Sequence, residues 1–225
     1  VSTNPCGEIP LCPYDSCRLL AINLYSYVEN PFTKEASFNF DLFKEHVHKA
    51  MHLMDDIIDL ELEKVEQIIN KVASDPEEAD IRHVEHELWK KIKDMALKGR
   101  RTGLGITAEG DMLAALGLRY GSDEAIDFAV SVHRTLAVEA YRASVKMAEE
   151  RGAFPIFDAA REASNPMIQR IKDVDPELYA EMVKHGRRNI AMLTIAPTGT
   201  TSLMSQTTSG IEPVFRPVYK RRRKI

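Results

Sequence analysis

The amino-acid sequence predicts an α/β protein that is rich in helices and contains few strands. Long stretches with apolar residues at helical spacing alternate with short apolar runs of strand length. Strands that are separated by long helices typically pair in parallel. Convincing strand patterns occur at 19–24, 103–107 and 190–196. Three strands are few for a closed barrel, so we expect this chain to form part of a larger fold.

The predicted elements follow one another in a regular order. Residues 1–17 are rich in Pro, Cys and Gly and predict an irregular loop. A helical stripe covers 41–72, with a break expected near Leu60. Ser122 is typical of a helix N-cap, and Gly152 of the position that ends the same helix. Further helices are predicted at 75–97, 110–116, 158–172 and 176–185.

Two sets of residues inside these elements predict how they pack. Gly103 and Gly105 in the second strand permit a neighbouring backbone to approach closely. Asp55, Asp56 and Asp59 lie on the helix at 41–72, and we interpret them as an exposed charged face rather than a metal cluster.

Composition argues against several classes of function. The net charge of −4 argues against a nucleic-acid-binding protein, and we interpret the basic run at 220–224 as a solvated segment. No apolar run approaches the ~20 residues that a membrane span needs, and no secretory signal pattern is present, so a cytoplasmic protein is expected. The cysteines Cys6, Cys12 and Cys17 lack paired zinc-site spacing, so no metal site is expected. Both ends of the chain are expected to be cuts through a longer protein.

The first motif with chemical potential is Asn4-Pro5-Cys6-Gly7-Glu8. Alternate side chains of an extended segment point the same way, so Asn4, Cys6 and Glu8 are expected to converge. A thiol, a carboxylate and an amide placed together suit a nucleophile, a base and an orienting hydrogen-bond donor. A proline-flanked loop with a buried Cys and an exposed Glu explains the same five residues.

The second motif is a small, hydroxyl-rich turn that follows the third predicted strand. It consists of Pro197, Thr198, Gly199, Thr200, Thr201 and Ser202. Backbone N–H groups in such a turn, leading into a helix N-terminus, can bind an anion. The turn lacks the Gly-Lys-Ser/Thr of a Walker A loop. An ordinary capping turn remains the alternative.

Taken together and in this order, several segments resemble ribonucleotide reductases. Residues 4–11 and 15–24 resemble the finger loop and the strand after it. Residues 100–107 and 115–122 resemble a later barrel strand and helix, 196–202 the substrate-phosphate loop, and 209–213 the segment just beyond it. The resemblance covers nearly the whole chain and is highly specific as a combination. It implies a ten-stranded α/β barrel, of which residues 1–225 are the C-terminal portion of the catalytic domain, with the finger loop at 1–17 and the phosphate loop at 197–202.

The resemblance also implies an activity, the reduction of ribonucleotides to 2′-deoxyribonucleotides that supplies DNA precursors. It implies that Cys6 is the transient thiyl radical that takes hydrogen from the ribose 3′ carbon, and that Glu8 accepts the 3′-OH proton. Asn4 would hold the ribose hydroxyls. Cys17 would be one of two reducing cysteines, its partner lying on an earlier strand that this sequence does not contain. Cys12 is interpreted as a packing or incidental residue.

The phosphates of the substrate would bind the backbone amides of 198–202, with hydroxyl groups assisting, and Pro197 would fix the entry angle of that loop. Ten residues separate Cys6 from Cys17, and this short gap resembles the adenosylcobalamin-dependent class. A radical from a separate metal-containing subunit is the alternative. The implied partners are a ribonucleoside di- or triphosphate, a thioredoxin-like or other thiol reductant, the upstream barrel half, and a second copy in a homodimer.

Two other interpretations stay open. A glycyl-radical-type barrel shares the finger-loop thiol but needs a C-terminal glycyl-radical segment, which is not visible in this sequence. A split subunit that works only with another chain carrying the first barrel half is compatible with the reductase interpretation. In either form of the reductase hypothesis, this chain alone is expected to be inactive.

Overall fold

The computed structural model describes residues 2–16, 18–216, 218, 220 and 222. Its strands are β1 (Ser2–Thr3), β2 (Pro10–Leu11), β3 (Leu19–Asn23), β4 (Val28–Glu29), β5 (Ser37–Phe38) and β6 (Gly103–Thr107), with a 3₁₀ turn at Leu24–Tyr27. Its helices are α1 (Phe40–Ala73), α2 (Ala79–Gly99), α3 (Glu109–Ala115), α4 (Asp123–Arg151), α5 (Ala159–Glu162), α6 (Pro166–Val174), α7 (Pro176–His185) and α8 (Gly199–Ser205).

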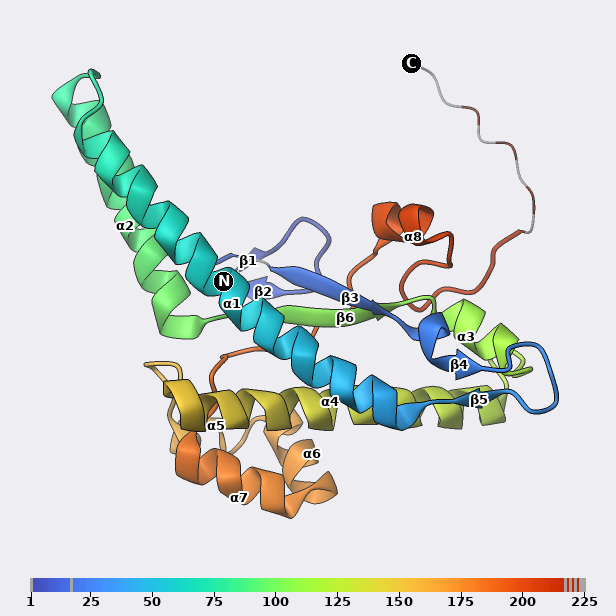
Figure 1. Cartoon of the computed structure of the whole chain (residues 1–225). Coiled ribbons are helices and arrows are strands. Elements are labelled where there is room, and N and C mark those ends of the chain that lie inside the picture. The colour runs from blue at the N-terminus through green and yellow to red at the C-terminus, as the bar shows by residue number, and fades with distance from the viewer. Residues whose placement is uncertain (1, 17, 217, 219, 221, 223–225) are drawn as a thin grey trace.

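Long helices make one side of the molecule and the short strands make the other (Figure 1). Helix α1 packs on both α4 and α2, and the far ends of α1 and α2 extend away from the body as an arm. Buried residues of α1, α4 and β6 belong to one hydrophobic core. Its largest fully buried side chains include Phe43 and Met51 of α1, and Leu104 and Ile106 of β6. In the described residues, no helix is both long and apolar enough to cross a membrane.

Strands β3 and β6 pair in parallel along their whole length, from Leu19 opposite Gly103 to Asn23 opposite Thr107. This confirms the parallel pairing that the sequence predicts. The two glycines of β6 sit where backbone crowds the strand. A Cβ at Gly105 would lie 2.2 Å from the Thr194 carbonyl oxygen, and one at Gly103 would lie 2.9 Å from the Arg18 carbonyl oxygen. Close approach is therefore the reason for both glycines.

The strand predicted at 190–196 is an extended run that pairs with β6 at a single parallel bridge, between Leu104 and Leu193. Backbone hydrogen bonds still hold it against β6, because Leu104 N donates to Met192 O at 2.7 Å and Thr194 N donates to Leu104 O at 3.0 Å. The run thus follows β6 only briefly before it enters the turn at 197–202.

Two helix predictions are wrong in extent. Helix α1 is continuous for 34 residues without the break expected near Leu60. Leu60 is 62% exposed, so it interrupts the apolar pattern by facing solvent, while the backbone stays helical. The helix predicted at 158–172 is two helices, α5 and α6. Asn165 caps α6 by accepting a hydrogen bond from Met167 N, and Pro166 starts the new helix because it cannot continue the old one.

Candidate active site

A cavity of about 500 Å³ lies between the β1–β2 hairpin, the strand pair β3–β6 and the turn that leads into α8. In Figure 1, the hairpin and α8 lie on the same side of the two strands. The cavity is lined by Asn4, Pro5, Cys6, Glu8, Leu19, Leu20, Ala21, Gly105, Ile106, Ala196, Pro197, Thr198, Gly199, Thr200 and Thr201. The two motifs that the sequence analysis singled out, nearly 200 residues apart, therefore share one cavity.

The hairpin positions the first motif. β1 and β2 pair antiparallel, with Ser2 opposite Leu11, and the chain turns at residues 4–9. Asn4 closes this turn, because Ile9 N donates to Asn4 Oδ1 at 3.1 Å and Gly7 N donates to Asn4 O at 3.1 Å. The segment is thus a turn and not the extended strand assumed for the alternation argument. Asn4, Cys6 and Glu8 converge on the cavity because the turn is closed, and not because alternate residues of a strand share a face.

The carboxylate of Glu8 is the most unusual group in the cavity. Both of its oxygens are inaccessible to water, and neither has a hydrogen-bond partner among the described residues. Taking a carboxylate out of water without a partner is unfavourable, so such a group needs a compensating function. Glu8 is also the only charged residue among the described residues that line the cavity. A substrate hydroxyl group could donate the hydrogen bond that these oxygens lack once the Glu8 side chain turns toward the cavity.

Two of the three cysteines, Cys6 and Cys12, lie within the described residues. Cys6 and Cys12 are both exposed free thiols, and Cys6 lines the cavity whereas Cys12 does not. Cys17 lies outside the described residues, so its role as a reducing cysteine stays a prediction.

The second motif is a helix start. Thr198 has a left-handed backbone (φ 51°) and caps α8, which begins at Gly199. Five of the six predicted residues line the cavity. Ser202 is buried and does not line the cavity, because its N–H donates to Thr198 O at 2.8 Å and its hydroxyl donates to Gly199 O at 2.9 Å. Thr200 and Thr201 are exposed residues that line the cavity.

Residues just after the β1–β2 hairpin are tied to helix α1. Arg101 forms an ion pair with Asp15 at 2.7 Å, and both side chains are at least 90% buried. Arg18 donates to the carboxylate of Glu61 on α1 and, at 3.0 Å, to the Arg101 carbonyl oxygen. These contacts attach the base of the hairpin to α1 and to the start of β6.

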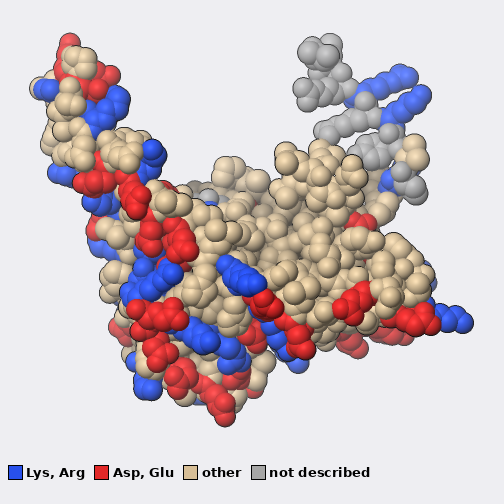
Figure 2. Space-filling model, in the orientation of Figure 1, with Lys and Arg blue, Asp and Glu red and all other residues tan. Residues whose placement is uncertain are grey.

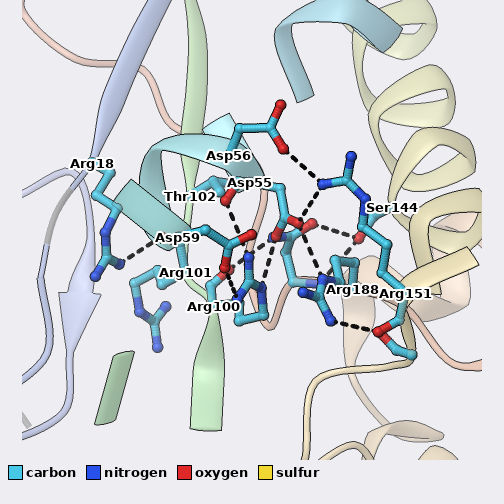
Figure 3. A network of polar contacts seen from close by, with 12 residues as sticks. Arg18, Asp55, Asp56, Asp59, Arg100, Arg101, Thr102, Ser144, Arg151 and Arg188 are labelled. Carbon is cyan, nitrogen blue, oxygen red and sulfur yellow. Dashed lines mark hydrogen bonds and ion pairs between the residues drawn. The ribbon is translucent and has the colours of Figure 1, made fainter. Parts of the chain in front are cut away.

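A buried ionic network that the sequence analysis missed lies beside this base (Figure 3). Asp55 is fully buried and accepts hydrogen bonds from Arg100 (2.8 Å), Arg188 (3.1 Å), Arg151 (3.3 Å) and Asn189 (3.2 Å). The interpretation of Asp55 as part of an exposed charged face is therefore wrong. Asp55 lies among the buried apolar positions of α1, four residues after Met51 and three before Ile58, and this placement was the available signal in the sequence.

The arginines determine the ionisation of Asp55. Burial by itself would raise the pKa of the Asp55 carboxyl, but hydrogen bonds and charges from Arg100 and Arg188 outweigh burial and hold the pKa below its usual value. Burial would likewise lower the pKa of Arg100, and hydrogen bonds to Asp55 and Asp59 raise it instead. The network is therefore a charged, satisfied cluster that joins α1, α4 and residues 187–189.

Charge is unevenly spread over the face that Figure 2 shows. Basic and acidic side chains alternate along the α1–α2 arm and the lower helices, while the surface around α8 is mostly uncharged. Within the described residues, no group of three or more His, Cys, Asp or Glu side chains is placed to hold a metal ion. Apart from Glu8, an anion in the cavity would meet only uncharged residues among those that the structure describes.

The fold and the cavity together define an α/β protein whose hairpin holds a thiol and a buried carboxylate opposite a helix N-terminus. Residues 1–224 match the family model described as ribonucleotide reductase, barrel domain. The chain therefore belongs to the ribonucleotide reductase family.

Individual relatives agree with the family model. The chain is 34% identical over 221 residues to a vitamin B12-dependent ribonucleoside-diphosphate reductase of Mycobacterium tuberculosis, covering 98% of this chain and 25% of that protein. It is 35% identical over 220 residues to a protein of the same name from Thermoplasma acidophilum, covering 98% and 23%. A ribonucleoside-diphosphate reductase subunit alpha of Treponema pallidum is 30% identical over 128 residues, covering 56% and 15%. The chain spans about a quarter of the length of the first two relatives.

Proposed function

We propose that this chain provides the thiyl-radical half of a ribonucleotide reductase active site, which converts ribonucleotides to 2′-deoxyribonucleotides for DNA synthesis. The observation that supports this most is the single cavity shared by Cys6, Glu8, Asn4 and the turn at 197–201. In this proposal β3, β6 and the run at 190–196 are strands of a ten-stranded barrel, and the enzyme acts in the cytoplasm.

In this scheme Cys6 carries the radical and Glu8 acts as the base. The Cys6 thiyl radical takes a hydrogen atom from the ribose 3′ carbon and becomes a thiol. Glu8 accepts the proton of the 3′-OH as the 2′-OH, protonated by a reducing thiol, leaves as water. At the end the proton returns from Glu8 to the 3′ oxygen, and the hydrogen atom returns from Cys6 to the 3′ carbon. The unpartnered oxygens of Glu8 support this role, because the 3′-OH supplies the hydrogen bond that the protein does not.

Asn4 has a restricted role in this scheme. Its Oδ1 already accepts from Ile9 N, so a hydrogen bond to a ribose hydroxyl would be donated by Nδ2. The same side chain thus closes the hairpin turn and orients the sugar, which is where positioning contributes to rate. Cys17, with a partner cysteine from the upstream barrel half, would supply the two electrons and two protons that the loss of water requires, closing into a disulfide.

The phosphates of the substrate would bind the first turn of α8. Helix geometry leaves the N–H groups of the first turn without intrahelical acceptors, and the hydroxyls of Thr200 and Thr201 stand beside them. Pro197 sets the angle at which the chain enters this turn. Ser202 contributes by holding the turn closed, since its own groups are engaged within it.

Adenosylcobalamin is the proposed cofactor, because two relatives that each match 98% of this chain are named vitamin B12-dependent. When bound, it supplies the radical that removes the hydrogen atom from the Cys6 thiol. Cys6 is a free thiol that lines the cavity, so it is the residue of the site that would hold the resulting radical. A thioredoxin-like or other thiol reductant, the upstream barrel half and a second copy of the enzyme complete the proposed partners.

The proposal is tested by complementation. The chain is mixed with a ribonucleoside diphosphate or triphosphate, a dithiol reductant and adenosylcobalamin, with and without the upstream barrel half. We expect deoxyribonucleotide only in the complemented mixture, abolished by Cys6→Ser and retained by Cys12→Ser, the matched control. Turnover that survives Cys6→Ser would contradict the proposal. Turnover that needs a metal-containing subunit in place of adenosylcobalamin would support the alternative radical source.

A further inference from the structure

The segment at 207–213 has no role in the scheme above, yet it lies between the start of α3 and the start of α8. On one side, Ala108 N donates to Thr208 O at 3.1 Å and Glu109 N donates to Gly210 O at 3.3 Å. On the other side, Thr207 N donates to Ser202 O at 3.0 Å. The segment therefore bridges the end of β6 and the helix whose first turn is proposed to bind phosphate.

Asp111 and Thr208 make the closest part of this bridge. Thr208 N donates to Asp111 Oδ2 at 2.6 Å, and Asp111 N donates to Thr208 Oγ1 at 3.3 Å. Each residue thus binds the backbone of the other with its side chain, as the two residues of a capping box do. A bond from a backbone N–H to an ionised carboxylate belongs to the stronger class of hydrogen bonds.

Close backbone packing supports the same pairing. A Cβ at Gly110 would lie 2.6 Å from the Glu212 carbonyl oxygen and 3.0 Å from Pro213 Cα. The first turn of α3 can therefore approach 208–213 this closely only because residue 110 is glycine.

The bridge continues to the cavity through Thr198. Gly210 N donates to Thr198 Oγ1 at 2.7 Å, and the same hydroxyl lies 3.0 Å from Thr107 Oγ1. Thr107 Oγ1 in turn lies 3.1 Å from Thr208 O, to which it donates. Thr198 is the left-handed cap of α8, so these bonds hold the residue that decides where the first turn of α8 points.

We propose that Asp111 and Thr208 are positioning residues for the substrate: their reciprocal pair holds 208–210, and Gly210 then holds the Thr198 cap of α8 at the rim of the cavity. This inference rests on the proposed function for its effect on catalysis. Neither residue lines the cavity, so we expect the effect to fall on phosphate binding and not on the radical step.

The experiment compares Asp111→Ala with Asp111→Asn, which keeps an oxygen that can accept the Thr208 N–H. In the complemented reductase assay, Asp111→Ala should raise KM for the ribonucleotide about ten-fold and change kcat less than about three-fold, the size expected for one lost hydrogen bond. Asp111→Asn should keep most of the wild-type KM. Asp173→Ala, an exposed aspartate of α6, is the matched control and should match wild type.

Amide hydrogen exchange on the chain without nucleotide provides a second measurement. Asp111→Ala should accelerate exchange at Thr208 and Gly210, and Asp111→Asn should not. An unchanged KM in Asp111→Ala would overturn the positioning role, and so would a loss of kcat at constant KM. Unchanged exchange at Thr208 and Gly210 would overturn the pairing itself. Absence of turnover in the wild-type mixture would instead contradict the proposed function, which separates the two failures.

Discussion

Two carboxylates of this protein are shielded from water, and they differ in their hydrogen-bond partners. Asp55 is surrounded by Arg100, Arg151, Arg188 and Asn189 and receives hydrogen bonds from all four. Glu8 lines an open cavity, and its two oxygens have no partner among the described residues. A satisfied buried charge stabilises a fold only while its partners remain, whereas an unsatisfied one lowers stability and is retained for what it binds. We therefore infer that Asp55 stabilises the fold and that Glu8 acts in the proposed reaction.

The largest expected effect is on the stability of the Asp55 region. Asp55→Ala should lower the free energy of unfolding by about 3–5 kcal/mol, because it leaves several arginines buried beside one another without their shared counter-charge. Chemical denaturation of the chain, followed by circular dichroism, measures this change. Asp56→Ala is the matched control, because Asp56 is exposed and pairs only with Arg151 among the described residues. An Asp55→Ala protein as stable as wild type would show that the ionic network around Asp55 does not stabilise the fold.

The same region should make stability depend on acid pH. The pKa of Asp55 is lowered in the folded state, so its contribution is fully present above the unfolded value of about 3.9 and is lost as pH falls through the folded pKa. Unfolding free energies measured from pH 6 downward should therefore decline below about pH 4. In Asp55→Ala this decline should be shallower, with the remainder coming from groups such as Asp175, whose pKa its hydrogen bond from Leu178 N also lowers. Equal slopes for both proteins would contradict the assigned pKa direction.

Strand β6 connects the two regions, and a smaller effect is expected there. Gly105→Ala would bring a methyl group to within 2.2 Å of Thr194 O, and backbone cannot move aside as a flexible side chain does. We expect a loss of about 1–3 kcal/mol in unfolding free energy from this overpacking. Gly199→Ala is the stability control, because a Cβ there meets no atom within 4 Å. A Gly105→Ala protein that loses no more stability than Gly199→Ala would show that the run at 190–196 is not held against β6.

Local patterns predict much of this fold and of the site, and distant pairings account for what they miss. The apolar stripe of α1, the Ser122 cap and the two glycines of β6 each depend on near neighbours, and the structure confirms them. The convergence of Cys6 with the turn at 197–201 followed from the family resemblance, because spacing could not bring two distant segments together. Asp55 pairs with Asn189 across 134 residues, and Asp111 with Thr208 across 97. No periodicity reports such a pair, although an aspartate on an apolar helix face is a usable hint.

The most direct test of the central contrast is a paired measurement on Glu8→Gln, of kcat in the complemented reductase assay and of unfolding free energy in the chain alone. Replacing an unpartnered buried carboxylate with a neutral amide should leave stability within about 1 kcal/mol of wild type or raise it, while deoxyribonucleotide formation falls by about 100-fold or more because the 3′-OH proton has no acceptor. Full activity in Glu8→Gln, or a loss of stability as large as that of Asp55→Ala, would contradict this account.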